Sequence, residues 1–179
     1  MKIRARDGAA SRAVRADDVG AYVIPPEHAV ALTRSSLLPI VPACVAVRRA
    51  SDDVRALVMC VLAVVLILSS VAHWRAPRWR GFARWMDIAC VSACVGYGCA
   101  TARAVDRTLA RGWWIGVSIA MCAWVTNHAT YARARAKWAR AKAVAEEEKT
   151  RVWRRLALTH MVGVHFMSSV SATWLAFGL

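Results

Sequence analysis

Four long runs of the chain carry no Lys, Arg, Asp or Glu, and the charged residues collect between them. The runs are residues 56–72, 88–102, 112–131 and 156–179. A helix that crosses a bilayer needs about 17–25 predominantly apolar residues. Three of the runs meet this length, and the run 88–102 does so if Trp85, Met86 and Asp87 lie in the membrane interface. The pattern therefore predicts four membrane-spanning helices.

A fifth segment, residues 28–47, is apolar but contains Arg34, Pro39 and Pro42. Proline is tolerated in membrane helices, and an arginine near a helix end can extend its guanidinium to the interface. Local hydropathy therefore leaves two alternatives: a fifth span, or an interfacial or buried segment.

The basic residues of the loops favour the fifth span. With five spans, eighteen Lys and Arg lie on the side of the N-terminus and six on the other side. With four spans the division is 13 against 12, which orients nothing. Cytoplasmic loops carry the excess of Lys and Arg. We therefore predict an all-α, multi-pass transmembrane helical bundle of about five spans over residues 27–179, with a cytoplasmic N-terminus.

Composition narrows the class of protein. The 179 residues are 58% hydrophobic with a net charge of +14, and disordered chains lack so many apolar residues. All six cysteines lie within apolar runs, which argues against a disulfide-stapled secreted domain. Residues 1–26 lack the apolar stretch of a secretory signal peptide, and we expect them to form a disordered, basic cytoplasmic tail.

Residues 132–155 are rich in alanine and charge, and they predict a charged cytoplasmic helix that leads into the last span. Its basic residues, together with Trp138 and Trp153, suit anionic lipid headgroups. Nothing in this stretch favours nucleic acid, so membrane lipids are the expected partners.

Small residues recur at four-residue spacing in two of the predicted spans. The stripes are Ser92, Gly96 and Ala100 in one span, and Gly112, Gly116 and Ala120 in the next. Such stripes let helix backbones approach closely, so we expect both to face the inside of the bundle. Cys90 and Cys94 also share a helical face; they suit small apolar filler better than a metal or redox pair.

All five histidines fall toward the cytoplasmic ends of the predicted spans, and Asp87 joins them. Ionisable residues at membrane depth suggest a functional site, and imidazoles with a carboxylate are the groups that a zinc site uses. The alternative is that each histidine is an ordinary interfacial residue, above all His28 and His128. His160 and His165 lie about 140° apart on an ideal α-helix, so they can share one metal ion only through a π-bulge or local unwinding.

The segment SSVAHWRAPRWRGFARWMDIACV combines Ser69-x-x-x-His73 with Asp87 at the start of the next helix. It resembles the second and third helices of the haemolysin III / adiponectin-receptor (progestin and adipoQ receptor) family of membrane zinc hydrolases. Upstream, EHAVALTRSS resembles the start of the family's first helix, although Thr33 is followed here by Arg34 rather than His. Downstream, THMVGVHF carries His160 and His165 where the family has a His-x-x-x-His pair. The resemblance covers roughly residues 27–102 and 156–169, and the family has seven helices rather than five.

This resemblance implies a zinc-dependent hydrolase of a lipid amide or ester, or a receptor-like relative. His73 with His160 or His165, preferably His165, would hold Zn²⁺ and leave a position open for water. Asp87 would act as general base, and Ser69 would lie one turn behind His73. The competing interpretation is a non-catalytic membrane scaffold or assembly protein. No Gly-x-Ser-x-Gly or phosphate-binding loop supports serine-hydrolase or nucleotide chemistry.

Overall fold

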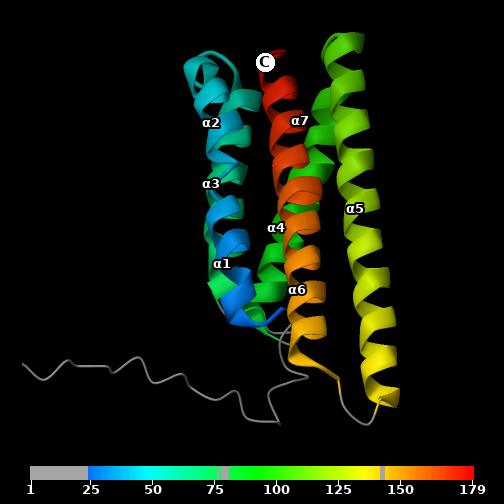
Figure 1. The fold of residues 1–179 in the computed structure, drawn as a ribbon. Helices are drawn as coiled ribbons and strands as arrows, with labels where there is room; N and C mark the ends of the chain where they lie inside the picture. The colour runs from blue at the N-terminus through cyan, green and yellow to red at the C-terminus, as the bar shows by residue number, and fades with distance from the viewer. Residues whose placement is uncertain (1–23, 76, 78–80, 142–143) are drawn as a thin grey trace, which may run out of the picture.

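The computed structural model describes residues 24–75, 77, 81–141 and 144–179. Within these residues the backbone forms five long helices and no strand (Figure 1). The all-α class is thereby confirmed. The expected tail, residues 1–26, lies almost wholly outside the described residues.

The five long helices run antiparallel to one another in chain order, so the first begins and the last ends at opposite ends of the bundle (Figure 1). They consist of α1 (Pro26–Ser35), α2 (Ile40–Ala46) and the 3-10 turn η2 (Val47–Arg49); α3 (Val54–Arg75); α4 (Phe82–Ala102); α5 (Arg107–Arg140); and α6 (Glu146–His160), the π-helical segment η3 (Met161–Phe166) and α7 (Met167–Ala176).

The first long helix changes its hydrogen bonding between α1 and α2. Pro39 has no backbone N–H, and its ring disfavours a carbonyl four residues earlier. The backbone therefore tightens here, and Leu38 N–H donates to the Ser35 carbonyl three residues back, at 3.1 Å. The helical direction nevertheless continues, so His28–Arg49 remains one helix of 22 residues.

The last long helix lies in the middle of the bundle (Figure 1). Its α7 part packs on α5, α2 and α4, and its α6 part packs on α5 and α1. The α3 helix packs along α4 and along both parts of the first helix. Among the described residues, two buried apolar clusters result. One lies around Trp113 and Leu175, at the end of the bundle that holds the C-terminus of the chain. The other lies around Leu32, Trp74 and Leu156.

Residues 132–155 differ from the single charged helix that we expected. The first part continues α5 to Arg140, because alanine, lysine and arginine are good helix formers, and α6 begins only at Glu146. The two parts fold back on each other, with the rings of Trp138 and Trp153 5.5 Å apart. Lys137 Nζ lies 2.7 Å from Glu148 Oε1, and this hydrogen bond lowers the pKa of Glu148.

Only one of the two small-residue stripes faces the inside of the bundle. On α5, a side chain at Gly112 would overlap Trp174 and one at Gly116 would overlap Ser171, as the prediction requires. On α4 the prediction is wrong. Ser92, Gly96 and Ala100 are exposed, and a Cβ at Gly96 would meet nothing. The face of α4 that packs closely carries Gly98 instead, which lies against the Trp113 ring.

Candidate functional site

A cavity of about 450 Å³ lies among the helices, and its wall is mostly apolar. Four of the five predicted site residues line it: His73, Asp87, His160 and His165. They come from α3, α4, α6 and the π-helical segment, so the fold brings together side chains that are far apart in the sequence. The fifth predicted residue, Ser69, is buried beside the cavity without lining it.

The contact between α3 and α4 holds the Asp87 carboxylate against two hydroxyl groups. The Ser70 hydroxyl donates a short hydrogen bond to Asp87 Oδ1. Ser69 Oγ lies 3.4 Å from the same oxygen, but it lies 3.0 Å from the Leu66 carbonyl oxygen. A hydroxyl has one proton to donate, and the nearer Leu66 carbonyl takes that of Ser69. Ser70, which the sequence analysis did not single out, is therefore the main partner of Asp87.

The π-helical segment η3 brings the two histidines of the last helix together, although they would lie on different faces of an ideal α-helix. A π-helix has a wider turn than an α-helix, because its hydrogen bonds run from residue i to residue i+5. The segment Met161–Phe166 lies between His160 and His165 and brings both side chains to one face. Their ring centroids lie 5.0 Å apart, with the ring planes at 82°.

Trp74 is the common neighbour of these imidazoles. Its ring centroid lies 4.6 Å from that of His73, 5.1 Å from that of His160 and 6.2 Å from that of His165. Both His73 Nδ1 and Trp74 Nε1 are buried, and no hydrogen-bond partner lies near either atom within the described residues. An unpartnered buried nitrogen is costly, so these atoms indicate a place where a ligand can bind.

Other polar residues also line the cavity, among them Arg84, Asn127 and His128. The Asn127 amide donates to the Leu156 carbonyl at 3.0 Å and thereby links α5 to α6. The His128 ring lies 4.3 Å from the Trp124 ring. The sequence analysis weighed His128 and His28 alike as interfacial residues. His128 lines the cavity, whereas His28 lies outside its lining.

Ser35 of α1 contacts a residue of the site from outside the cavity, although no pattern in the sequence pointed to it. Its Oγ lies 2.6 Å from His165 Nδ1. Ser35 is buried and does not line the cavity. The first helix therefore contributes to the site through a contact between residues 130 positions apart.

The donor set fits zinc in its chemistry, and the distance between the His160 and His165 rings is compatible with a shared ion. Two imidazoles that share a tetrahedral zinc ion at about 2 Å per nitrogen place their ring centroids about 5 Å apart. Across the described residues, however, no three His, Cys, Asp or Glu side chains are arranged as a formed metal site. His73 therefore does not complete a set of three ligands with the His160–His165 pair in this structure.

Comparison with protein-family models, with curated proteins and with solved structures finds no match for this chain.

Proposed function

We propose that the chain is an integral membrane protein whose five long helices all cross the bilayer. Two helices, His28–Arg49 and Val54–Arg75, are long and apolar enough to do so. Only 28% and 22% of their most apolar windows are buried within the protein, whereas the core helix of a soluble protein is mostly buried. Large apolar side chains such as Leu68, Ile115 and Phe166 are exposed on other faces as well. Lipid is the solvent that such a surface requires.

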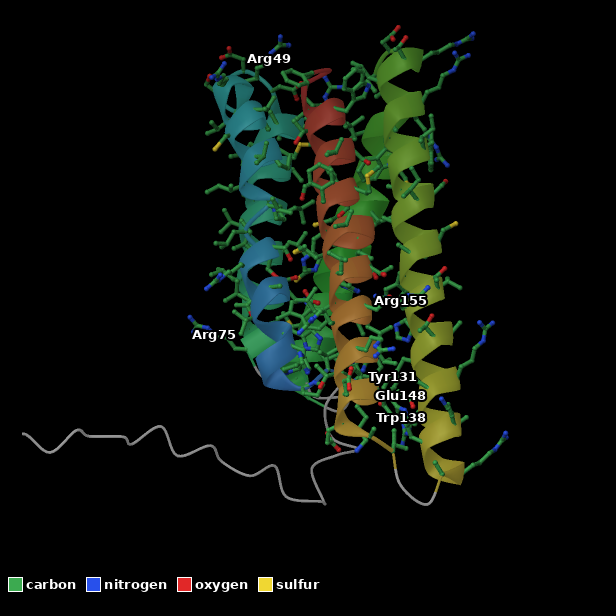
Figure 2. All side chains as sticks on the ribbon, in the orientation of Figure 1. Arg49, Arg75, Tyr131, Trp138, Glu148 and Arg155 are labelled. Atoms are coloured by element: carbon green, nitrogen blue, oxygen red, sulfur yellow. The ribbon has the colours of Figure 1, made fainter. Side chains whose placement is uncertain are left out.

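The α5 helix also supports a bilayer around the bundle. Its uncharged part, residues 112–131, measures about 30 Å at 1.5 Å per residue, which equals the thickness of the hydrocarbon core. The charged continuation of α5 would then project beyond the bilayer. Figure 2 shows Trp138 and Glu148 near this end of the bundle and Arg49 at the opposite end.

We further propose that the cavity is the centre of a zinc-dependent hydrolase for a lipid amide or ester, as the resemblance to the haemolysin III family implies. The observation that carries this proposal is the convergence of His73, Asp87, His160 and His165 on one cavity. The mainly apolar wall suits an acyl chain, and the polar group of the lipid would lie against the imidazoles and Asp87.

In this proposal His160, His165 and His73 would hold the metal ion. A bound zinc ion would lower the pKa of its water to about 7 and polarise the substrate carbonyl. Asp87 would take the proton of the attacking water, and the hydroxyl of Ser70 would keep its carboxylate directed at that water. The buried Trp74 would support the three imidazoles from the side.

A second candidate is a non-catalytic membrane scaffold whose cavity holds a lipid chain. The observation in its favour is that, although these side chains line one cavity, no three of them within the described residues are arranged to hold one metal ion. A catalytic zinc ion generally keeps three protein ligands. The two candidates therefore differ in whether the purified protein retains zinc.

The deciding experiment measures zinc in the detergent-purified protein and in three variants. We expect about one zinc ion per wild-type chain, and much less than one in His73→Ala. His28→Ala is the matched control, because His28 lies outside the cavity lining, and it should keep its zinc. Asp87→Asn should also keep zinc but lose about 10²–10⁴-fold in the hydrolysis of long-chain amides or esters. A wild-type protein without zinc would rule out the hydrolase and leave the scaffold.

A further inference from the structure

The cavity reaches the outer surface of the bundle between α4 and α5. Of the described residues that line it, five are exposed, and all five belong to these two helices: Ile88, Val91 and Ser92 on α4, and Met121 and Trp124 on α5. The exposed fractions of the four large apolar residues lie between 41% and 49%. The described lining residues from the rest of the chain are buried or half-buried. The opening of the cavity therefore lies between α4 and α5.

Close packing ends the opening on the side of the loop that joins the two helices. A Cβ at Gly98 of α4 would overlap the Trp113 ring of α5, and both residues are buried. Farther along both helices the lining residues become exposed. Ser92 lies at this rim, and a Cβ at Gly96 beside it would meet nothing within 4 Å. The small residues of α4 therefore leave the rim uncovered.

In the proposed membrane, the opening has the depth of one leaflet. Met121 lies ten residues from Tyr131, the last residue of the uncharged part of α5, which is about 15 Å at 1.5 Å per residue. Because the hydrocarbon core is about 30 Å thick, Met121 lies near its middle. Ile88 begins the uncharged run of α4, directly after Asp87. The opening thus extends from the membrane interface to about the middle of the bilayer.

The polar groups beside the opening lie at its interfacial end. Asp87 precedes Ile88, and Asn127 and His128 follow Trp124 by about one helical turn; all three of these polar residues line the cavity. A lipid of the adjoining leaflet has the same arrangement, with polar groups at the interface and apolar chains that extend toward the middle of the bilayer. A molecule dissolved in water would have to cross hydrocarbon to reach the same opening.

We propose that the opening between α4 and α5 is a lateral portal through which an acyl chain of a bilayer lipid passes from the adjoining leaflet into the cavity. The portal rests on the membrane part of the proposed function. It does not depend on zinc or on hydrolysis, because a scaffold that holds a lipid chain would need the same entrance.

The test uses the full chain in phosphatidylcholine vesicles. Phosphatidylcholine with a photoreactive group on its acyl chain is added after reconstitution, and peptide mass spectrometry after irradiation shows which residues the chain reaches. In the wild type we expect labels on lining residues that are only half-exposed or less, such as Leu66 and Val117. We also expect labels on the outer surface, for example at Leu68, which is exposed and lies outside the lining.

Tryptophan at either rim should obstruct the portal. Val91→Trp and Met121→Trp act from opposite sides, and each should lose most of the interior labelling while the outer surface is labelled as before. Ile119→Trp is the matched control on α5, because Ile119 is exposed but does not line the cavity, and it should match the wild type. Trp124→Ala widens the opening and should speed interior labelling.

Interior labelling that is absent from the wild type, or that is unchanged in both rim variants, would overturn the portal. Extraction of the membranes at alkaline pH separates this failure from a failure of the proposed function. A protein that alkali releases would refute the membrane-spanning bundle and the portal together. A protein that resists alkali, holds no zinc and is labelled as expected would refute the hydrolase and leave the portal standing.

Discussion

At the scale of single residues, the site depends on small hydroxyl groups that position larger polar groups. Ser70 holds the Asp87 carboxylate, and Ser35 holds the His165 ring. Each serine is buried within the protein. Hydrogen bonds to charged groups contribute more to stability than those between neutral groups. Of the two neighbouring serines of α3, Ser70 should therefore contribute more than Ser69 to the free energy of unfolding.

We expect Ser70→Ala to lower the free energy of unfolding by about 1–3 kcal/mol, the usual cost of leaving a buried polar group without its partner. Ser69→Ala should lower the free energy of unfolding by less. The Ser69 hydroxyl donates mainly to the Leu66 carbonyl of the same helix, so its loss leaves Asp87 with its main partner, Ser70. Denaturant unfolding in detergent measures both changes, and each variant serves as the control for the other. A larger loss in Ser69→Ala would contradict the assignment of Ser70 as the partner of Asp87.

The sequence could predict that His73 and Asp87 would lie near each other, because their spacing and their places at helix ends carry information, and both line the cavity. It could not distinguish Ser69 from Ser70. Adjacent residues of a helix lie about 100° apart, and only the position of α4 decides which of them meets Asp87. The contact of Ser35 could not be predicted from the sequence for a related reason. Spacing reports on contacts within one helix, whereas Ser35 meets a residue of another helix.

At the scale of elements, the four uncharged runs predicted the positions of four of the five helices. They predicted less accurately the residues at which those helices begin and end. The α5 helix continues nine residues beyond the uncharged run, to Arg140, because a charged sequence rich in alanine remains a good helix. The π-helical segment has no sequence signature of its own. The i, i+5 spacing of His160 and His165 indicated only that such a segment would be needed if both side chains were to share one metal ion.

The two glycine stripes show what a spacing pattern leaves open. Four-residue spacing identifies a small-residue face, but it does not say whether another helix covers that face. On α5 the last helix covers it, with Ser171 against Gly116. On α4 nothing in the described part of the protein covers Gly96.

These surroundings predict opposite outcomes for the same substitution. Gly116→Leu should lower the free energy of unfolding by about 1–3 kcal/mol or more, because the new side chain must displace Ser171. Gly96→Leu is the matched control on a neighbouring helix. It should leave stability unchanged or raise it, since leucine is the better helix former. Thermal unfolding of both variants in detergent provides the measurement, and an unchanged midpoint for Gly116→Leu would contradict the close packing of α5 on α7.

At the scale of the whole molecule, the two ends of the bundle differ in character. The imidazoles and Asp87 lie in the half of the bundle where α1 begins and α3 ends, around the buried cluster of Leu32, Trp74 and Leu156. The cluster near the C-terminal end is built of apolar residues such as Met59 and Leu175. A lipid that entered the cavity would therefore find the imidazoles and Asp87 at one end only. In the proposed membrane orientation, that end is the cytoplasmic one.

The topology of the whole chain provides the last prediction. Five membrane-crossing helices that run alternately up and down would place the two termini on opposite sides of the membrane, and the eighteen-to-six division of Lys and Arg predicts a cytoplasmic N-terminus. A topology reporter fused at residue 1 should therefore report the cytoplasm, and one fused after Leu179 should report the opposite side. Two internal positions serve as controls. A reporter inserted at Ser51, between η2 and α3, should agree with the C-terminus, and one inserted at Ala145, between α5 and α6, should agree with the N-terminus. If both termini reported the same side, one of the five helices would not cross the bilayer. The first helix would then be the first to re-examine, because it contains Arg34 and Pro39.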